Sequence, residues 1–258
     1  MAYLPLWREF QARLLCVRDR LPMACLMCRT RTPGGLCRYC RQAVCDSMAS
    51  AQRRCERCDG LLASDSVHCA DCPALTPALE RVVAAFDYAW PGDLLIQRLK
   101  RRGQFSCVPV LAGLLAARCQ AVRSLDAAAA PPLGVGAGAW VTAVPSSRRA
   151  LVVRGYNPAG EVGRALARRL GLEWRPELLQ RTRERAGQTA LGREARRHAV
   201  RGLYRCTQAG VAGREVVVVD DVMTTGSTLS AVADVLKAQG AAKIWGVVLA
   251  RTPQRSSG

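Results

Sequence analysis

Short apolar runs alternate with amphipathic segments along most of the chain. Strand-like runs occupy residues 81–88, 140–144, 216–220 and 244–250, and helical spacing of apolar positions occupies residues 93–102, 109–123, 157–170 and 229–239. Residues 125–139 are small and rich in proline and glycine, which predicts a loop. Because strands and helices alternate, the pattern predicts an α/β fold, in which a largely parallel sheet has helices on its faces.

The first part of the chain has a different pattern, in which paired cysteines with two residues between them recur. They form two quartets, Cys25, Cys28, Cys37 and Cys40, then Cys55, Cys58, Cys69 and Cys72. A CxxC turn points two thiolates at one metal, and two such turns complete a tetrahedral zinc site. Tandem pairs therefore favour two structural zinc ions over a redox dithiol, which needs a single pair. The spacing leaves the pairing open, although the short loops favour closure in sequence order.

These patterns divide the 258 residues into two parts. We expect residues 1–78 to form an N-terminal helix and a small double zinc-ribbon region, which needs its metal to fold because it has little apolar core. Residues 79–258 contain the alternating strands and helices, and they are numerous enough to bury an α/β core of their own.

The most specific chemistry lies in the run VVVVDDVMTTGSTL at residues 216–229. Its valines predict a buried strand, and Asp220 and Asp221 stand at the strand end, where open α/β sheets bind ligands. Gly226 lets the backbone approach an anion, and the following helix start points its N–H groups at that anion. Hydroxyl groups add further donors from Thr224, Thr225, Ser227 and Thr228. Carboxylates that suit sugar hydroxyls or Mg2+, placed beside a phosphate cradle, indicate a sugar-phosphate ligand.

The charge of the chain suggests a second kind of partner. A net charge of +18 and an isoelectric point near 10.1 favour a polyanion such as nucleic acid, although a GC-rich genome gives a similar arginine excess. Residues 148–205 contain 15 Arg and no Lys against 5 Glu, a net charge of +10. Guanidinium groups pair bidentately with phosphate, so this stretch predicts a surface for pyrophosphate or a nucleic-acid backbone. Arg164, Arg168 and Arg169 are expected on a solvated helix face instead.

Within that stretch, Arg154, Gly155 and Asn157 follow the predicted strand at residues 140–144. Asparagine followed by proline is a favourable helix start, so Asn157 is expected to cap the helix that runs to residue 170. The arginines would then crowd one strand-to-helix crossing. Aromatic residues that could stack on bases are few, and all are expected to be core residues: Tyr39, Phe105, Tyr156 and Tyr204.

These motifs together resemble a known family. The run at residues 216–229 resembles the signature of the type I phosphoribosyltransferases, which bind phosphoribosyl pyrophosphate (PRPP). The four CxxC pairs, ALVVRGYNPA at residues 150–159, RTRERAGQTALGREARRHAVRGLY at residues 181–204 and the 216–229 run follow in the order seen in ComF-type proteins. The chain therefore resembles the ComF family (ComFC or GntX-like) over nearly its whole length. Pro158 replaces the family's glutamine, Ala199 replaces an asparagine, and Arg101 replaces the aromatic residue of the family's LKY segment.

The resemblance implies roles for the candidate residues. Asp220 and Asp221 would contact the ribose hydroxyls, and the turn at residues 224–228 would hold the 5′-phosphate of PRPP, with Mg2+ present. Arg154, Gly155 and Asn157 would lie near the pyrophosphate. The resemblance also implies a role in DNA uptake during natural transformation, with single-stranded DNA and the DNA-uptake machinery as partners on the cytoplasmic side.

Two classes of function remain open at this point. In the first, the protein is a phosphoribosyltransferase in which an acceptor attacks the anomeric carbon of PRPP, either in DNA uptake or in nucleotide metabolism without a DNA role. In the second, it is a binding module that accommodates a phosphorylated ribose while the zinc ribbons and arginines bind single-stranded DNA. The sequence identifies no catalytic residue and no acceptor.

The chain is expected to be cytoplasmic. Charged residues interrupt the apolar positions of the N-terminus, so no uninterrupted apolar segment of a secretory signal is present. No apolar run approaches the roughly 20 residues that a membrane span needs.

Overall fold

The computed structural model describes residues 22–49, 53–62, 69, 72–123, 132–136, 138–182 and 202–253. The predicted N-terminal helix lies outside the described residues, as do residues 183–201 of the family block.

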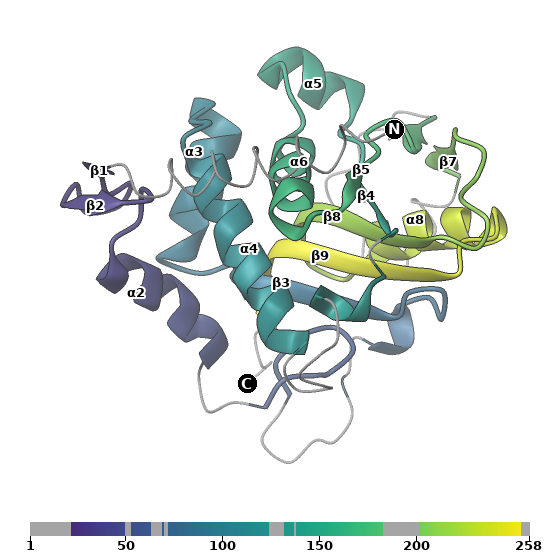
Figure 1. The fold of residues 1–258 in the computed structure, drawn as a ribbon, viewed down its shortest axis with the longest axis horizontal. Coiled ribbons are helices and arrows are strands. Elements are labelled where there is room, and N and C mark those ends of the chain that lie inside the picture. The colour runs from purple at the N-terminus through teal and green to yellow at the C-terminus, as the bar shows by residue number, and fades with distance from the viewer. Residues whose placement is uncertain are drawn as a thin grey trace, which may run out of the picture.

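In the described part of the chain, five parallel strands form the central sheet in the order β3-β9-β8-β4-β5 (Figure 1). They are β3 (Arg81–Asp87), β4 (Trp140–Ala143), β5 (Glu173–Trp174), β8 (Glu215–Met223) and β9 (Lys243–Arg251). The central strands β8 and β9 are nearly continuous apolar runs, as expected where both faces of a parallel sheet are covered. The α/β fold with a parallel sheet and flanking helices is confirmed.

Helices cover both faces of this sheet (Figure 1). Those described are α3 (Gly92–Arg102), α4 (Cys107–Arg123) and α6 (Pro158–Leu170) on one face and α8 (Ser227–Ala238) on the other. Val217 and Val219 pack in the cluster that contains α4 and α6, whereas Val216 and Val218 pack in the cluster that contains α8. Alternate residues of a strand point to opposite faces, so a run of four valines can fill both halves of the core.

Smaller elements surround the sheet. They are the antiparallel pair β1 (Pro22–Ala24) and β2 (Arg31–Pro33), the helix α2 (Arg38–Ala49), the helix α5 (Arg148–Arg154), the antiparallel pair β6 (Leu179–Arg181) and β7 (Tyr204–Cys206), and two short 3-10 turns at Cys72–Ala74 and Pro132–Gly134. Among the helices of the described part of the chain, none has the length and apolar character needed to cross a membrane.

The predicted strands and helices of residues 79–258 are present, but one boundary differs in a way that affects the site. β8 continues to Met223, so Asp220 and Asp221 lie within the strand and not after it. Parallel pairing with β9 carries the strand past the acids, because Asp220 pairs with Val248 and Met223 pairs with Arg251. The acidic pair is therefore held by sheet hydrogen bonds.

The pattern of apolar residues does not predict α5. Its apolar residues Leu151, Val152 and Val153 are consecutive and do not follow helical spacing, and all three are exposed. A helix that buries no apolar stripe gives no periodic signal in the sequence.

Candidate functional site

The acidic pair lies near the carboxyl end of β8, between β9 and β4. The backbone N–H of Asp221 donates to the Asp220 carboxylate at 2.8 Å. Lys100 reaches the pair from α3, and its Nζ lies 2.8 Å from the Asp221 carboxylate. The side chains of Lys100 and Asp221 retain 28% and 22% of their exposure, so this ion pair is still open to a ligand.

Burial and a neighbouring like charge both raise the pKa of Asp220. Burial and the neighbouring Asp221 charge raise the pKa of Asp220 to about 7, and the Asp221 N–H and Lys100 oppose that rise. A bound cation relieves both the repulsion and the desolvation of adjacent carboxylates. The arrangement therefore suits a divalent cation or a set of sugar hydroxyls.

The turn at residues 224–228, here named the phosphate loop, connects β8 to α8. Gly226 has a φ of 76°, and a Cβ at this position would overlap Leu75 and lie 2.6 Å from the methyl group of Met223. Only glycine fits here. Gly226 is also the N-cap residue of α8 and offers no side-chain acceptor to the first-turn N–H groups, while Thr225 Oγ1 donates to Ser227 Oγ at 3.2 Å. N–H groups and hydroxyls at the start of a helix can bind an anion.

A basic cavity of about 650 Å³ lies between α3 and α5. Its cationic lining residues are Lys100, Arg101, Arg149 and Arg154. Because Lys100 lines the cavity and also pairs with Asp221, the cavity adjoins the acidic pair. The Arg154 Nε is buried, and no group in the described part of the chain accepts a hydrogen bond from it. An anion in this cavity would meet several guanidinium and ammonium groups.

The turn before α6 holds Arg154 in place. Gly155 ends α5 with a φ of 78°, and its N–H donates to the Leu151 carbonyl at 2.7 Å. Asn157 occupies the N-cap position of α6, but its side chain does not make the predicted capping hydrogen bond. Instead it donates to the Val144 carbonyl and accepts from Ser146 Oγ, both at 2.9 Å. Gly155 and Asn157 therefore shape the turn, whereas Arg154 lines the cavity.

Each cysteine quartet closes in sequence order, as the short loops favoured. We name Cys25, Cys28, Cys37 and Cys40 the first cluster and Cys55, Cys58, Cys69 and Cys72 the second cluster. Within each, the four Sγ atoms lie within 4.8 Å of one another. Pairs such as Cys28–Cys37 and Cys58–Cys69 are 3.6 and 3.4 Å apart, close to the roughly 3.8 Å expected for thiolates on one zinc ion. Both clusters can hold a metal ion.

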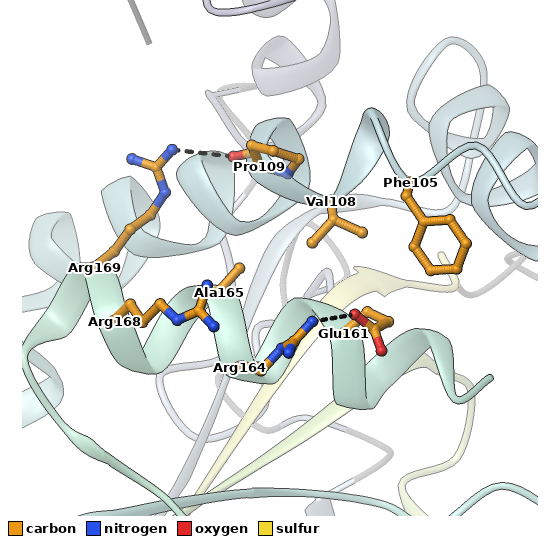
Figure 2. Close-up of a pocket in the computed structure, with 8 residues that line it drawn as sticks. All are labelled: Phe105, Val108, Pro109, Glu161, Arg164, Ala165, Arg168 and Arg169. Carbon is orange, nitrogen blue, oxygen red and sulfur yellow. Dashed lines mark hydrogen bonds and ion pairs between the residues drawn. The ribbon is translucent and has the colours of Figure 1, made fainter. Parts of the chain in front are cut away.

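A smaller cavity of about 220 Å³ lies between the start of α4 and α6 (Figure 2). Three arginines of α6 line it: Arg164, Arg168 and Arg169. Figure 2 shows Arg164 directed toward Glu161, at 3.0 Å, and Arg169 donating to the Pro109 carbonyl at 3.3 Å. Arg164 and Arg168 are exposed, as predicted for a solvated face, but their side chains gather around a hollow.

An aromatic contact connects the turns beside the two cavities. Phe105 lines the smaller cavity and Tyr156 lines the basic cavity, and their ring centroids are 4.7 Å apart. The prediction that Phe105 and Tyr39 are core residues is wrong, since they are 48% and 67% exposed, whereas Tyr204 is buried as predicted. Phe105 is exposed because it lies in the short turn between α3 and α4, where no described element covers it.

Comparison with known proteins agrees with this architecture. Residues 162–257, which include the acidic pair and the phosphate loop, match the phosphoribosyl transferase domain family. The DNA utilization protein YhgH of Escherichia coli O157:H7 is 32% identical over 234 residues, which are 90% of this chain and 98% of that protein. The chain belongs to the ComF family. Competence protein F of Haemophilus influenzae is similar to this ComF-family chain, with 27% identity over 88% of this chain and 96% of that protein.

A crystal structure of TT1426 from Thermus thermophilus aligns with a TM-score of 0.32 and 20% identity. It covers 57% of this chain and 84% of that chain, and at this level of similarity it supports no conclusion about function.

The roles of two residues near the site were not predicted from the sequence. Lys100 was identified only as part of a family motif, and its contact with Asp221 joins α3 to β8. Arg251 ends β9 and donates to the carbonyl groups of Met223 and Thr224, where the phosphate loop begins. The sequence does show that Arg251 ends an apolar strand, which is an unusual place for an arginine. The groups that Arg251 bonds, however, depend on the register of the strands.

Replacing Asp220 by asparagine should reduce the pH dependence of the free energy of unfolding. The Asp220 pKa is raised from 3.8 to about 7, so the stability it contributes is present below pH 3.8 and is lost as pH rises through 7. We expect Asp220→Asn to be more stable than wild type near pH 8, by about 2 kcal/mol after allowance for partial exposure, and this advantage should shrink toward pH 4. Urea denaturation across this range measures it.

Lys100→Met provides the matched comparison, because Lys100 lowers the Asp220 pKa. In that variant the loss of stability should move to higher pH. If the difference in the free energy of unfolding between wild type and Asp220→Asn stayed constant with pH, this would contradict a raised pKa of Asp220.

Proposed function

We propose that this ComF-family chain binds PRPP with Mg2+ and acts on single-stranded DNA during DNA uptake on the cytoplasmic side. The observation that carries the PRPP proposal is the placement of three complementary surfaces at one end of the sheet. These are the acidic pair, the phosphate loop and the basic cavity, which Lys100 connects to the acidic pair. PRPP has a sugar diol, a monophosphate and a pyrophosphate, which require these three kinds of surface.

The assignment of PRPP groups follows from charge and geometry. The 5′-phosphate would accept hydrogen bonds from the phosphate loop and the start of α8. The ribose hydroxyls would donate to Asp220 and Asp221. The pyrophosphate would lie in the basic cavity, where Lys100 and Arg154 would pair with its oxygens. The donor set of two carboxylates fits Mg2+, which when bound supplies positive charge to the pyrophosphate.

Lys100 has a specific place in this proposal. In the absence of ligand its ammonium group balances Asp221. With PRPP and Mg2+ bound, the carboxylate would gain a second partner, and Lys100 would be free to pair with the pyrophosphate from the cavity that it already lines. Such stabilisation of a pyrophosphate would also favour its departure, if an acceptor displaces it from the anomeric carbon.

Asp220→Asn combined with Asp221→Asn should abolish measurable PRPP binding. Removing both carboxylates leaves the ribose hydroxyls and the metal without their acceptors, which should cost at least about 100-fold in affinity. Isothermal titration calorimetry with PRPP and Mg2+ measures this. Asp93→Asn on α3 removes one equal charge outside the site and should bind as wild type does. Wild-type affinity in the double variant would contradict the assignment of the acidic pair.

We propose that zinc occupies both cysteine clusters. All-cysteine tetrahedral sites with sulfurs at this spacing prefer zinc, and a closed shell of four thiolates fits a structural ion. Elemental analysis of the purified protein should find about two zinc ions per chain, and Cys28→Ser or Cys58→Ser should each lower that number toward one. A value near one in the wild type would mean that only one cluster is a zinc site.

The DNA part of the proposal rests on the two adjoining cationic cavities and on Phe105. Backbone phosphates could pair with the arginines of both cavities. A base could stack on the half-exposed ring of Phe105, which lines the smaller cavity (Figure 2) and contacts Tyr156 of the basic cavity. The names of two relatives, DNA utilization protein and Competence protein F, support the proposal that the chain acts on DNA. The alternative is a phosphoribosyltransferase of nucleotide metabolism without a DNA role.

Fluorescence anisotropy with a labelled oligothymidylate tests the DNA proposal. Phe105→Ala should weaken binding by about 1–2 kcal/mol through lost stacking, and Arg168→Ala should reduce the salt slope by about one. Lys243→Ala is the matched control, because Lys243 begins β9 at the opposite end of the sheet from the site. No binding of the oligonucleotide by the wild type would favour the alternative without a DNA role.

A further inference from the structure

The second cluster covers the free edge of the central sheet. β3 is an edge strand, and its outward N–H groups need partners. Val82 N–H donates to the Arg57 carbonyl at 2.7 Å, and Ala84 N–H donates to the Asp59 carboxylate at 2.8 Å. Arg57 lies within the first CxxC turn of the second cluster, and Asp59 directly follows that turn. The metal site therefore takes the place of a sixth strand.

Two ion pairs fix the same segment to α4 and to β3. Asp59, which is buried, also pairs with Arg118 of α4 at 3.1 Å. Arg54 pairs with Asp87, the last residue of β3, at 2.7 Å, and the exposed fractions of their side chains are 9% and 8%. Breaking a buried pair leaves uncompensated charges, so these contacts hold the cluster in one position relative to the sheet.

Arg251 connects this cluster to the phosphate loop. The side chain is buried, and its Nη1 donates to the carbonyl oxygens of Met223 and Thr224. Its Nη2 lies 3.5 Å from the place that a Cβ on Gly60 would take, and that same place is 3.3 Å from Cys58 Sγ. One guanidinium group therefore extends from the loop backbone to the immediate surroundings of the metal ligands.

The segment that follows the second cluster makes a separate connection to the loop. Leu75 packs so closely against Gly226 that a Cβ there would overlap it. The N–H of Thr76 donates to Ser230 Oγ in the first turn of α8 at 3.2 Å. Arg57 holds this segment from the cluster side by donating to the Thr76 carbonyl at 2.8 Å. The loop is thus supported from the cluster by a guanidinium group and by a packed segment.

Metal occupancy adds an electrostatic contribution. Four thiolates around a divalent ion carry a net charge of about −2, and a buried guanidinium group is stabilised by nearby negative charge. The metal-bound cluster would therefore hold Arg251 where it bonds the loop carbonyls. Ligand-supporting groups around a metal site commonly act in this way, through orientation and charge.

The first cluster has a different environment. Cys25 and Cys37 pack in the hydrophobic cluster that contains α3, α4 and α6, whereas Cys58 and Leu75 pack in the one that contains α8. The two cysteine clusters thus pack in different hydrophobic clusters of the core. Among the described residues, the contacts that reach the phosphate loop come from the side of the second cluster.

We propose that Arg251 is a positioning residue that ties the second cluster to the phosphate loop, so that metal in this cluster determines the order of the loop and its affinity for PRPP. The PRPP part rests on the proposed function, whereas the coupling between cluster and loop does not depend on any ligand. Metal in the first cluster does not affect the loop.

Hydrogen exchange followed by mass spectrometry tests the coupling without PRPP. Arg251→Lys keeps the charge but cannot span both the loop carbonyls and the cluster, so it should retain two metal ions per chain and speed exchange of residues 223–230 about tenfold. PRPP affinity should fall by a similar factor. Unchanged loop exchange in the folded variant overturns the proposal. If the wild type did not bind PRPP, the proposed function would be refuted. The exchange result would still decide whether the cluster and the loop are coupled.

Cys58→Ser and Cys28→Ser form a matched pair that does not alter Arg251. Each removes one ligand, from the second and first cluster respectively. Cys58→Ser should speed exchange at residues 223–230, and Cys28→Ser should leave it unchanged while exchange near β1 and β2 rises. Equal effects of the two variants on exchange of the loop would overturn the proposal. This comparison decides the question even if Arg251→Lys does not fold.

Discussion

The parallel pairing of β8 with β9 is the interaction on which the rest of the site depends. It extends β8 through Asp220 and Asp221 to Met223, and it places Arg251 opposite Met223 at the point where the phosphate loop begins. Because sheet pairing fixes the backbone at Asp220 and at Val222, on either side of Asp221, the two like charges can be held next to each other in the strand. The loop then starts from a fixed point, and the N-terminus of α8 follows it at once.

Several features of this site lower the stability of the folded protein. Burial and the charge of Asp221 raise the Asp220 pKa, and Lys100 brings a compensating cation from another element. The absence of a side-chain cap at Gly226 likewise leaves N–H groups of α8 for a ligand. Strong packing of alternate valines on both faces of β8 supplies the rigidity that allows these unfavourable features to persist.

The cysteine clusters solve a different physical problem. The segments that carry them have few large apolar residues, and ion pairs to β3 and α4 hold the second of these segments in place. The second cluster also covers the edge of β3, where unpaired N–H groups would otherwise be open to solvent or to another chain. The segment that carries the second cysteine cluster is in this way part of the α/β core and not an appendage of it.

The sequence by itself determined the alternation of strands and helices, the two cysteine quartets and the local chemistry of residues 216–229, because periodicity, CxxC spacing and turn residues act over short distances. It also located the turn that carries Arg154. Only the tertiary structure decided that β8 continues past its acids, that Asn157 bonds Val144 and Ser146, and that α5 forms without an apolar stripe. The contacts of Lys100 with Asp221 and of Arg251 with Thr224 join elements far apart in the chain. They depend on sheet order and register, which many residues determine together.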